Sequence, residues 1–508
     1  ITITAATVET TGGNITLQAA DNVVIGAAPN GDSTLHATTG SITINAAGNF
    51  TLNSGSNVSA TAGSVAITAG GNFTLNSNST ILAGTTINIA ASGSTIDIFG
   101  ALSSTTNNIS DGNSNNVILL QNMTLSGTTN VYDGSGQDTI TVNQPESITN
   151  GDLNLDGGTG NTSYTVDYTG SNNYVINVNA SAPSMTPVTL TSTGSGSSQT
   201  LSPAVADQSF NASSDVNLSN STITVSTDEY QTGDVVRYDY GTTATGAPTS
   251  IGGLNNGELY YVVVTGPNTI QLASTLADAL EANPVIVAFT GLGSSNTQTL
   301  QAVVETLPFN AAQAVNTTAN TLSIASNGYL NGERVVYNDG GGTAIGGLTN
   351  GATYYVIVVD ANTIELSSTA PTAGSTLTIN GTNNADNILM RANTTGSAFV
   401  ADLDANSNVE RVNYTGAISD LVVNTLGGND TVTMDDNLTY TLVQGSGGND
   451  TFQVGQVFQS LRDAAAGVAA GDQFATTLTS QGYLSNGISF ETTILGGTGN
   501  DLFTVYHN

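Results

Sequence analysis

The chain has 508 residues, and its formal net charge is −33 because 38 Asp and Glu face only five basic side chains, all of them arginine. Nucleic acid and anionic membrane surfaces are bound through patches of Lys and Arg, so neither is an expected partner. The absence of cysteine excludes disulfides, thiolate zinc sites and cysteine nucleophiles.

No positively charged leader precedes an apolar stretch at the start of the sequence, and no segment has the ~20 apolar residues that span a bilayer. We therefore expect a mature or excised piece of a longer product, without membrane insertion. Carboxylates that repel one another are relieved by divalent cations. The composition thus favours a partner of positive charge.

Internal repeats dominate the first hundred residues. Gly40-Ser41-Ile42-Thr43-Ile44 returns at Gly63, Gly48-Asn49-Phe50-Thr51-Leu52 returns at Gly71, and a looser copy starts at Gly84. Apolar residues alternate with Thr, Ser or Asn and then meet Gly or Asn, which is typical of short strands between turns. Such units cannot bury an apolar face alone, so stacking into a β-solenoid is expected.

These strings resemble the β-helical repeats of filamentous-haemagglutinin-type exoproteins. The resemblance covers residues 1 to 100 and implies a bacterial secreted or surface-attached protein. The expected first domain is a β-solenoid over residues 1–186.

A longer repeat occupies the middle of the chain. Gln199-Thr200-Leu201 matches Gln298-Thr299-Leu300, Gly233 to Tyr238 matches Gly332 to Tyr337, and Tyr260-Tyr261-Val262 matches Tyr354-Tyr355-Val356. The matched strings are rich in aromatic and β-branched residues and lie between turn residues. They predict two tandem copies of one small β module, at residues 187–283 and 284–371.

The paired tyrosines leave two interpretations open. Tyr260 and Tyr354 are candidate contacts for a glycan, because aromatic faces pack well on sugar rings. Alternation along a strand places one tyrosine of each pair in the core instead. Packing is the favoured interpretation.

Helical spacing is rare in this sequence. Val457, Phe458, Leu461, Ala464, Ala465 and Val468 recur at helical intervals and predict one short helix. A shorter helix is predicted over Leu276 to Leu280.

Glycine-rich turns recur in the last part of the chain. Gly496-Gly497-Thr498-Gly499-Asn500-Asp501-Leu502-Phe503 fits the pattern G-G-x-G-x-D-x-U in full, and imperfect copies end in Asp138, Asp386, Asp430 and Asp450. These turns resemble the calcium-binding β-roll of repeats-in-toxin (RTX) proteins. The resemblance implies Ca²⁺ held by backbone carbonyls and by these Asp side chains between successive turns.

Asp430 and Asp450 form the best candidate calcium pair, because their spacing suits neighbouring coils. Asp501 has no partner in the chain at that spacing. Asn and Asp also serve as plain solenoid corners, which is the alternative without a metal. The expected last domain is an RTX-like solenoid region over residues 372–508.

An enzyme is not expected. A β-helical polysaccharide lyase needs a Lys or Arg base, but lysine is absent and the arginines are scattered. No carboxylate pair is marked out for a hydrolase. The two histidines, His36 and His507, lie in polar or terminal positions.

The sequence therefore predicts an all-β protein: a β-solenoid, two tandem small β modules and a C-terminal calcium-type solenoid region. The expected function is structural and adhesive, in a bacterial extracellular assembly such as a surface layer, fibre or large adhesin stabilised by calcium. The expected partner is another copy or a continuation of the same surface polypeptide. The alternatives are a glycan-binding adhesin module, with cell-surface glycans as partner, and a β-helical lyase or hydrolase.

Overall fold

The computed structural model describes most of the chain in two units. The first unit contains residues 1–182, 375–488 and 494–508, and the second contains residues 183–374 and 489–493. The described residues are 1–26, 31–112, 115–158, 161–180, 185–195, 198–226, 229–241, 249–280, 284–293, 297–360, 362–371, 374–393, 396–403, 408–455, 457–458, 476–479, 482–485, 487–490 and 492–506.

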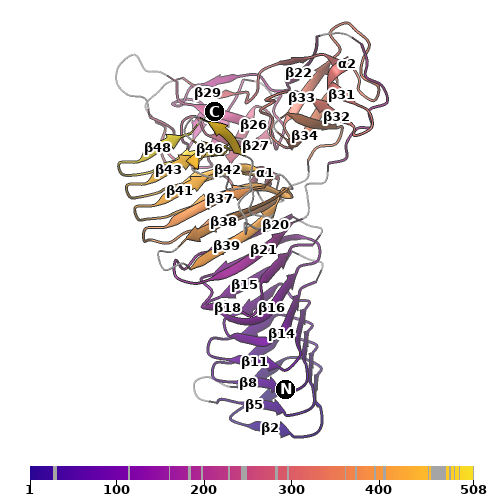
Figure 1. Ribbon diagram of the computed structural model, residues 1–508, viewed down its shortest axis with the longest axis vertical. Coiled ribbons are helices and arrows are strands. Elements are labelled where there is room, and N and C mark those ends of the chain that lie inside the picture. Colours follow the sequence, from indigo (N-terminus) through magenta and orange to yellow (C-terminus); the bar gives the residue numbers. More distant parts are fainter. Residues whose placement is uncertain are drawn as a thin grey trace. The chain divides into compact units, whose positions relative to one another are not determined.

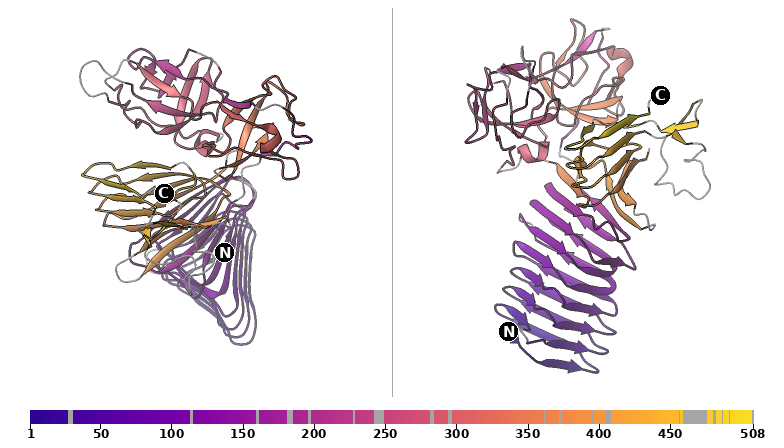
Figure 2. Two further views of the ribbon diagram at one scale, coloured as in Figure 1. Left: turned by 45° about the horizontal axis from the view of Figure 1, so that its top comes forward. Right: turned by 90° about the vertical axis from the view of Figure 1, so that its left-hand side faces the viewer.

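The first unit is a β-solenoid, as predicted, and its N-terminal coils have three sides (Figures 1 and 2). One side consists of β1 (Thr2–Ile3), β4 (Val23–Ile25), β7 (Phe50–Leu52), β10 (Phe73–Leu75), β13 (Thr95–Ile98), β15 (Val117–Gln121), β17 (Gln137–Asn143) and β20 (Asn161–Asp167). All neighbours on this side are parallel.

The other two sides are parallel ladders that share two long strands. One ladder contains β2 (Thr7–Thr10), β5 (Thr34–Ala37), β8 (Asn57–Ala60), β11 (Thr80–Ala83) and β18 (Ser147–Thr149). The other contains β3 (Ile15–Ala19), β6 (Ile42–Ala46), β9 (Val65–Ala69), β12 (Thr86–Ala91), β19 (Leu153–Asp156) and β21 (Tyr174–Asn179). Strands β14 (Ala101–Ser110) and β16 (Thr124–Tyr132) span both sides, with an irregularity between Ser103 and Thr106.

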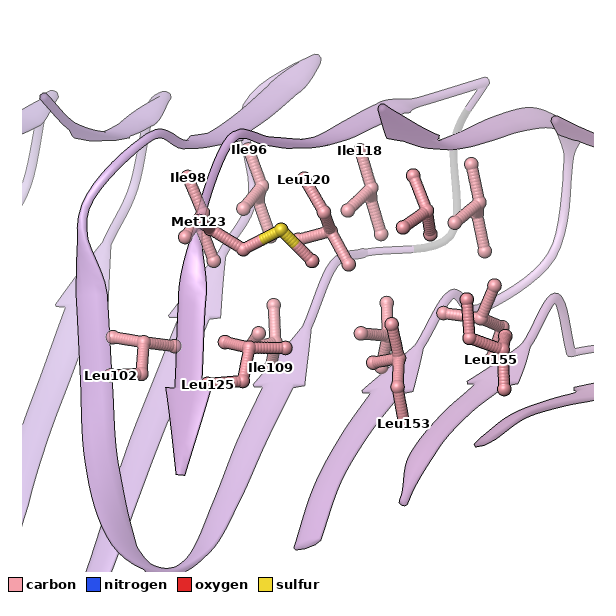
Figure 3. Close-up of a cluster of buried hydrophobic side chains, with 14 of the residues drawn as sticks. Ile96, Ile98, Leu102, Ile109, Ile118, Leu120, Met123, Leu125, Leu153 and Leu155 are labelled. Carbon is pink, nitrogen blue, oxygen red and sulfur yellow. The ribbon is translucent and has the colours of Figure 1, made fainter. Parts of the chain in front are cut away.

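Strand register confirms the repeat in the N-terminal coils. Phe50 pairs with Phe73, and their rings stack with centroids 5.2 Å apart. In the looser copy the strand pairing is shifted by one residue from the alignment of the motifs. Aligning Gly84 with Gly63 would place Thr86 opposite Val65, but Val65 pairs with Ile87. This register keeps the alternate isoleucines inside, where a continuous core of Ile, Leu and Val fills the coils (Figure 3).

An asparagine ladder runs along one outer side of the solenoid. From Asn108 onward, the Nδ2 group of each member donates to the Oδ1 atom of the member in the preceding coil, at 2.7 to 3.0 Å. Its members are Asn88, Asn108, Asn130, Asn154, Asn177 and Asn413. Hydrogen bonds between identical side chains thus add to the backbone pairing between coils.

The solenoid continues across the second unit without a break in pairing. Strand β20 pairs in parallel with β36 (Ser375–Asn380), and β21 pairs in parallel with β39 (Val409–Thr415). Glu410 strengthens this junction, because its carboxylate accepts hydrogen bonds from Thr169 N at 2.7 Å and Asn172 N at 2.8 Å. Tyr174 Oη donates to the same carboxylate at 3.1 Å.

The C-terminal coils have two sides in place of three. The long 12-stranded sheet ends with β36, β40 (Ile418–Asn424), β42 (Tyr440–Gln444) and β47 (Thr492–Leu495). Opposite lie β37 (Asn387–Ala392), β41 (Thr431–Met434), β43 (Thr451–Val454) and β48 (Leu502–Val505), paired in parallel. Strands β37, β38 (Ser397–Leu403) and β39 form an antiparallel meander at the transition.

The second unit contains two antiparallel sheets of seven strands each. The first module sheet has the order β23 (Gln208–Phe210), β29 (Gln298–Gln301), β26 (Val235–Asp239), β27 (Leu259–Gly266), β28 (Thr269–Ala273), β25 (Thr222–Thr224) and β24 (Val216–Asn217). The second module sheet has the order β30 (Leu307–Phe309), β22 (Gln199–Pro203), β33 (Arg334–Asn338), β34 (Thr353–Asp360), β35 (Thr363–Ser367), β32 (Thr321–Ser323) and β31 (Val315–Asn316).

The two sheets exchange one strand each. Strand β22 belongs to the first sequence copy but lies between β30 and β33 of the second, whereas β29 belongs to the second copy but lies between β23 and β26 of the first. A cut between residues 283 and 284 therefore removes one strand from each sheet.

Helix content is very small, as expected. The predicted helix over Leu276–Leu280 is present as α1, and a second helix, α2, covers Ala311–Ala314. The helix predicted from Val457 is wrong at its start, because Val457–Phe458 forms β44, which pairs with β46 (Gly482–Ser485) beside β45 (Thr476–Thr479). Its remaining positions, Leu461 to Val468, lie outside the described residues.

Candidate functional site

The glycine-rich turns of the C-terminal coils connect the two sides of the solenoid at one edge. Residues 425–430, 445–450 and 496–501 each follow a strand of the 12-stranded sheet and precede a strand of the opposite side. Residues 381–386 occupy the same position one coil earlier, between β36 and β37. Four of the five motifs found in the sequence, those with Asp386, Asp430, Asp450 and Asp501, thus form one column of turns.

Three glycines let these turns stack closely. Gly428, Gly448 and Gly499 have φ of 142°, 141° and 140°. A Cβ atom on Gly448 would lie 1.4 Å from the carbonyl oxygen of Gly428, and one on Gly499 would lie 1.5 Å from that of Gly448. The carbonyl of each turn therefore rests on the α-carbon of the next, where only glycine fits.

The four predicted aspartates of this region form a ladder. Asp386 N donates to Asp430 Oδ1 at 2.9 Å, Asp430 N donates to Asp450 Oδ1 at 2.9 Å, and Asp450 N donates to Asp501 Oδ1 at 3.1 Å. We call these four residues the aspartate ladder. The placement of Asp430 and Asp450 in neighbouring coils is confirmed.

The expectation that Asp501 lacks a partner is wrong. Asp501 follows Asp450 directly in the stack, since β48 pairs with β43, although 51 residues separate them in the sequence. The chain leaves the stack after β43 and returns with β47, so distance along the sequence overestimates the number of coils. The Gly-Asn-Asp string occurs in both turns, and this recurrence could have identified Asp450 as the neighbour of Asp501 from the sequence.

The asparagines of the same turns form a second ladder beside the first. Asn449 N donates to Asn429 Oδ1 at 2.8 Å, and Asn500 N donates to Asn449 Oδ1 at 2.9 Å. The Asp side chains of these strings therefore accept a backbone N–H from the preceding coil, whereas Asn429 and Asn449 accept one from the following coil. Capping of backbone donors is thus a role of these residues that needs no metal.

Two carboxylate oxygens of the aspartate ladder remain without a donor. Asp430 and Asp450 are each 1% exposed, and their Oδ2 atoms have no hydrogen-bond partner. Burial raises the pKa of Asp430, and it raises the pKa of Asp386 to about 6, with a further contribution from the neighbouring carboxylates. Buried acceptors of this kind are stabilised by a proton or by a cation.

The donor chemistry of the aspartate ladder fits a hard cation in part. Calcium takes six to eight oxygen ligands, often including backbone carbonyls. Within the described ranges, no group of three or more His, Asp or Glu side chains is placed to hold a metal ion. A calcium ion at Asp430 and Asp450 would therefore need backbone carbonyls and water to complete its shell.

Asp138 lies outside this column. It is on β17, where Asn116 N donates to its Oδ1 atom at 2.9 Å and Thr162 is its partner in the next coil. Thr162 N in turn donates to Ser375 Oγ at 3.1 Å. Hydroxyl side chains thus follow Asp138 in that column, and the structure does not bring Asp138 together with the four ladder residues.

Both candidate glycan-binding tyrosines lie in the cores of the module sheets. Tyr260 is 2% exposed and donates to Glu258 Oε2 at 2.7 Å. Tyr354 is 5% exposed, and its hydroxyl accepts Thr349 N at 2.9 Å. Rings in these positions serve as packing residues, and the glycan contact stays a prediction.

A polar hollow near the meander was not visible in the sequence. It has a volume of about 440 Å³ and is lined by residues of β19, β21, β38 and β39 that include Asn154, Asn177, Phe399, Arg411 and Asn413. The Arg411 guanidinium lies 3.8 Å from the centroid of the Phe399 ring. Arg411 Nε also donates to Asn413 Oδ1 at 2.6 Å, at the end of the asparagine ladder.

The histidines mark no catalytic arrangement among the described residues. His36 lies beside the hydroxyl groups of Ser59 and Thr38, each at 3.3 Å. His507 lies outside the described residues.

No protein-family model matches this chain, and neither a curated protein nor a solved structure matches it. Among the described helices, none has the length and apolar character that crossing a membrane requires.

Proposed function

We propose that this protein is a structural and adhesive component of a bacterial extracellular assembly, such as a surface layer, a fibre or a large adhesin, and that calcium stabilises it. The observation that carries the proposal is the aspartate ladder, in which two buried carboxylate oxygens lack a donor. Calcium is held at Asp430 and Asp450, with Asp386 and Asp501 in the adjacent coils and Asp138 as a separate candidate.

Charge supports a requirement for cations. A net charge of −33 with five arginines leaves most carboxylates without a basic partner. Bound calcium offsets part of this self-repulsion and links successive coils, which makes the solenoid more rigid. The similarity of the Gly-Asn-Asp turns to RTX proteins supports the same role and an extracellular location.

Exposed edges support self-association. In β48, Leu502, Phe503 and Val505 are 58%, 51% and 65% exposed, and among the described strands β48 pairs only with β43. Unpaired strand edges bind another strand readily. A second copy, or a further coil of the same surface polypeptide, pairs with this edge.

The experiment compares the wild type with Asp430→Asn/Asp450→Asn in calcium and in chelator. Asparagine keeps the Oδ1 acceptors of the ladder but removes the negative charge. We expect calcium to raise the melting temperature of the wild type and to lengthen its particles in negative-stain images, and to do neither in the variant. Equal melting temperatures and equal particle lengths of the wild type with and without chelator would refute the calcium-dependent function.

A second candidate function, glycan binding, is favoured by the hollow at Arg411. Amide groups, a guanidinium and an aromatic ring around a volume of about 440 Å³ are the groups that fix polar ligands in small pockets. A glycan array with the wild type and Arg411→Gln tests it. Binding that is lost in Arg411→Gln would support an adhesin that reads cell-surface glycans, whereas an array without signal would leave the structural role.

A further inference from the structure

Two neighbouring loops in the N-terminal half of the solenoid carry a second group of buried acidic side chains. One loop connects β14 to β15, with residues 111, 112, 115 and 116 described, and the other connects β16 to β17 through residues 133–136; Asp138 is the second residue of β17. They lie in adjacent coils, since Ser110 pairs with Tyr132 and Val117 pairs with Thr139. Asp111 therefore lies next to Asp133, and Asn116 lies next to Asp138.

Hydrogen bonds tie this corner together. Asn116 N donates to Asp138 Oδ1 at 2.9 Å, and Asn116 Nδ2 donates to Asp133 Oδ1 at 3.5 Å. Gly134 N donates to Asp133 Oδ1 at 3.0 Å, and Gly112 N donates to Asp111 Oδ1 at 2.7 Å. Each carboxylate thus uses one oxygen atom to accept a backbone N–H group.

The other oxygen atoms of the corner have no donor. Asp111 Oδ2, Asn116 Oδ1, Asp133 Oδ2 and Asp138 Oδ2 are buried and without a hydrogen-bond partner. Their residues are 9%, 1%, 0% and 2% exposed, in that order. The Nδ2 group of Asn116 donates to Asp133 Oδ1 and to the carbonyl oxygen of Gly112, so its buried Oδ1 atom is a further acceptor without a donor, independent of the three carboxylates.

No basic side chain compensates this charge from within the coils. The first Lys or Arg of the sequence is Arg237, so the first 236 residues contain neither. Buried carboxylates are found paired, protonated or bound to a metal ion. Oxygen donors alone, from carboxylates and an amide, select a hard divalent cation over a transition metal.

We propose that Asp111, Asn116, Asp133 and Asp138 form an internal calcium site between two coils of the N-terminal solenoid. The site rests on the calcium-dependent function proposed above and adds Asp111, Asn116 and Asp133 to the candidate Asp138. The three carboxylates do not form a ready-made metal cluster. The Asn116 amide oxygen and water complete the shell of the ion, which links the two coils.

The test counts calcium bound to the full chain by equilibrium dialysis and follows melting temperature by circular dichroism. The starting protein is Asp430→Asn/Asp450→Asn, which removes the charge of those two residues. Asp133→Asn/Asp138→Asn is added to it, and exposed Asp152→Asn provides a control from the coil that follows. Asparagine keeps the Oδ1 acceptors for Gly134 N and Asn116 N, so folding is retained.

We expect the corner variant to bind one calcium ion fewer than the starting protein, whereas the Asp152 control binds the same number. In chelator the corner variant should melt at a higher temperature than the starting protein, because two buried charges are gone. In calcium it should lose the stabilisation that the starting protein gains. Unchanged calcium stoichiometry in the corner variant would overturn the site, whatever the outcome at Asp430 and Asp450.

Magnesium provides a further comparison with the same proteins. Calcium, with its larger and more flexible shell, should bind more tightly than magnesium, which demands octahedral geometry and keeps its waters. Equal stabilisation by sodium alone at matched ionic strength would show charge screening and would also overturn the site.

Discussion

Tyr337 donates a hydrogen bond to Gln199 Oε1 at 2.6 Å, and Tyr238 donates one to Gln298 Oε1 at 2.5 Å. The four residues are two copies of one pair, yet each tyrosine bonds to the glutamine of the other sequence copy. In both cases the hydroxyl also accepts a backbone N–H, from Ile345 and from Ile251. The strand exchange between the module sheets is thus fixed by a buried polar contact in each core.

This exchange predicts which fragments fold. A fragment of residues 187–283 follows the sequence repeat but lacks β29 and carries β22 without its sheet. A fragment of residues 204–301 contains all strands of the first module sheet. We expect cooperative thermal unfolding from 204–301 and none from 187–283, as measured by circular dichroism. The reverse result would show that the exchange is not needed for folding.

Because the glycines of the turns stack closely, we expect one added methyl group at Gly448 to lower the free energy of unfolding strongly. Gly448→Ala places a Cβ atom 1.4 Å from the carbonyl oxygen of Gly428 at a positive φ. The backbone must move, and we expect a loss of about 3 kcal/mol or more in the free energy of unfolding. Gly416→Ala is the control, since nothing lies within 4 Å of its added Cβ. Urea denaturation of both variants measures the difference, and equal midpoints would contradict the close stacking.

We expect Glu410 to stabilise the junction at which the solenoid resumes after the inserted unit. Its two oxygen atoms accept from Thr169 N, Asn172 N and Tyr174 Oη, among others. In Glu410→Gln an amide N–H group faces one of these donors, and we expect a destabilisation of about 2–4 kcal/mol. Exposed Glu9→Gln should change stability by less than about 0.5 kcal/mol. A stability of Glu410→Gln equal to that of the wild type would disprove this role.

Burial of acidic groups predicts that stability in chelator rises on mild acidification. Burial raises the pKa of Asp111 and of Asp138 from 3.8 to about 6, and the nearby Asp133 carboxylate adds to both shifts. A group with a raised pKa in the folded chain contributes stability that is complete below its unfolded pKa and is lost as the pH rises through about 6.

The melting temperature in chelator should therefore increase when the pH is lowered from about 7 to about 5. The increase should be smaller in Asp111→Asn/Asp138→Asn, and calcium should reduce it in the wild type by replacing the protons. A melting temperature that falls over this interval in chelator would contradict the raised pKa values.

Repeats that keep their spacing made much of the fold predictable from the sequence. Phe50 and Phe73 share one string and one register, and Asp430 and Asp450 lie one coil apart as their spacing indicated. Asp501 escaped prediction because the chain between β43 and β47 leaves the stack, so its partner is distant in sequence.

The strand exchange and the corner at Asp133 escaped for other reasons. Gln199 and Gln298 occupy matching strings of the repeat, so similarity alone cannot assign which tyrosine each one meets. The corner depends on which oxygen atoms are buried without donors. That property arises only when two loops are placed side by side.

The pairing of β20 with β36 has a consequence for how this molecule varies. Tyr164 and Val166 meet Leu377 and Ile379 in register, so the coil after the excursion stacks as though nothing had intervened. Because the entropy of closing a loop grows only slowly with its length, the excursion between these strands is free to change in size and content. An insertion at this point can therefore differ in length or sequence without a change in the pairing of the coils on either side.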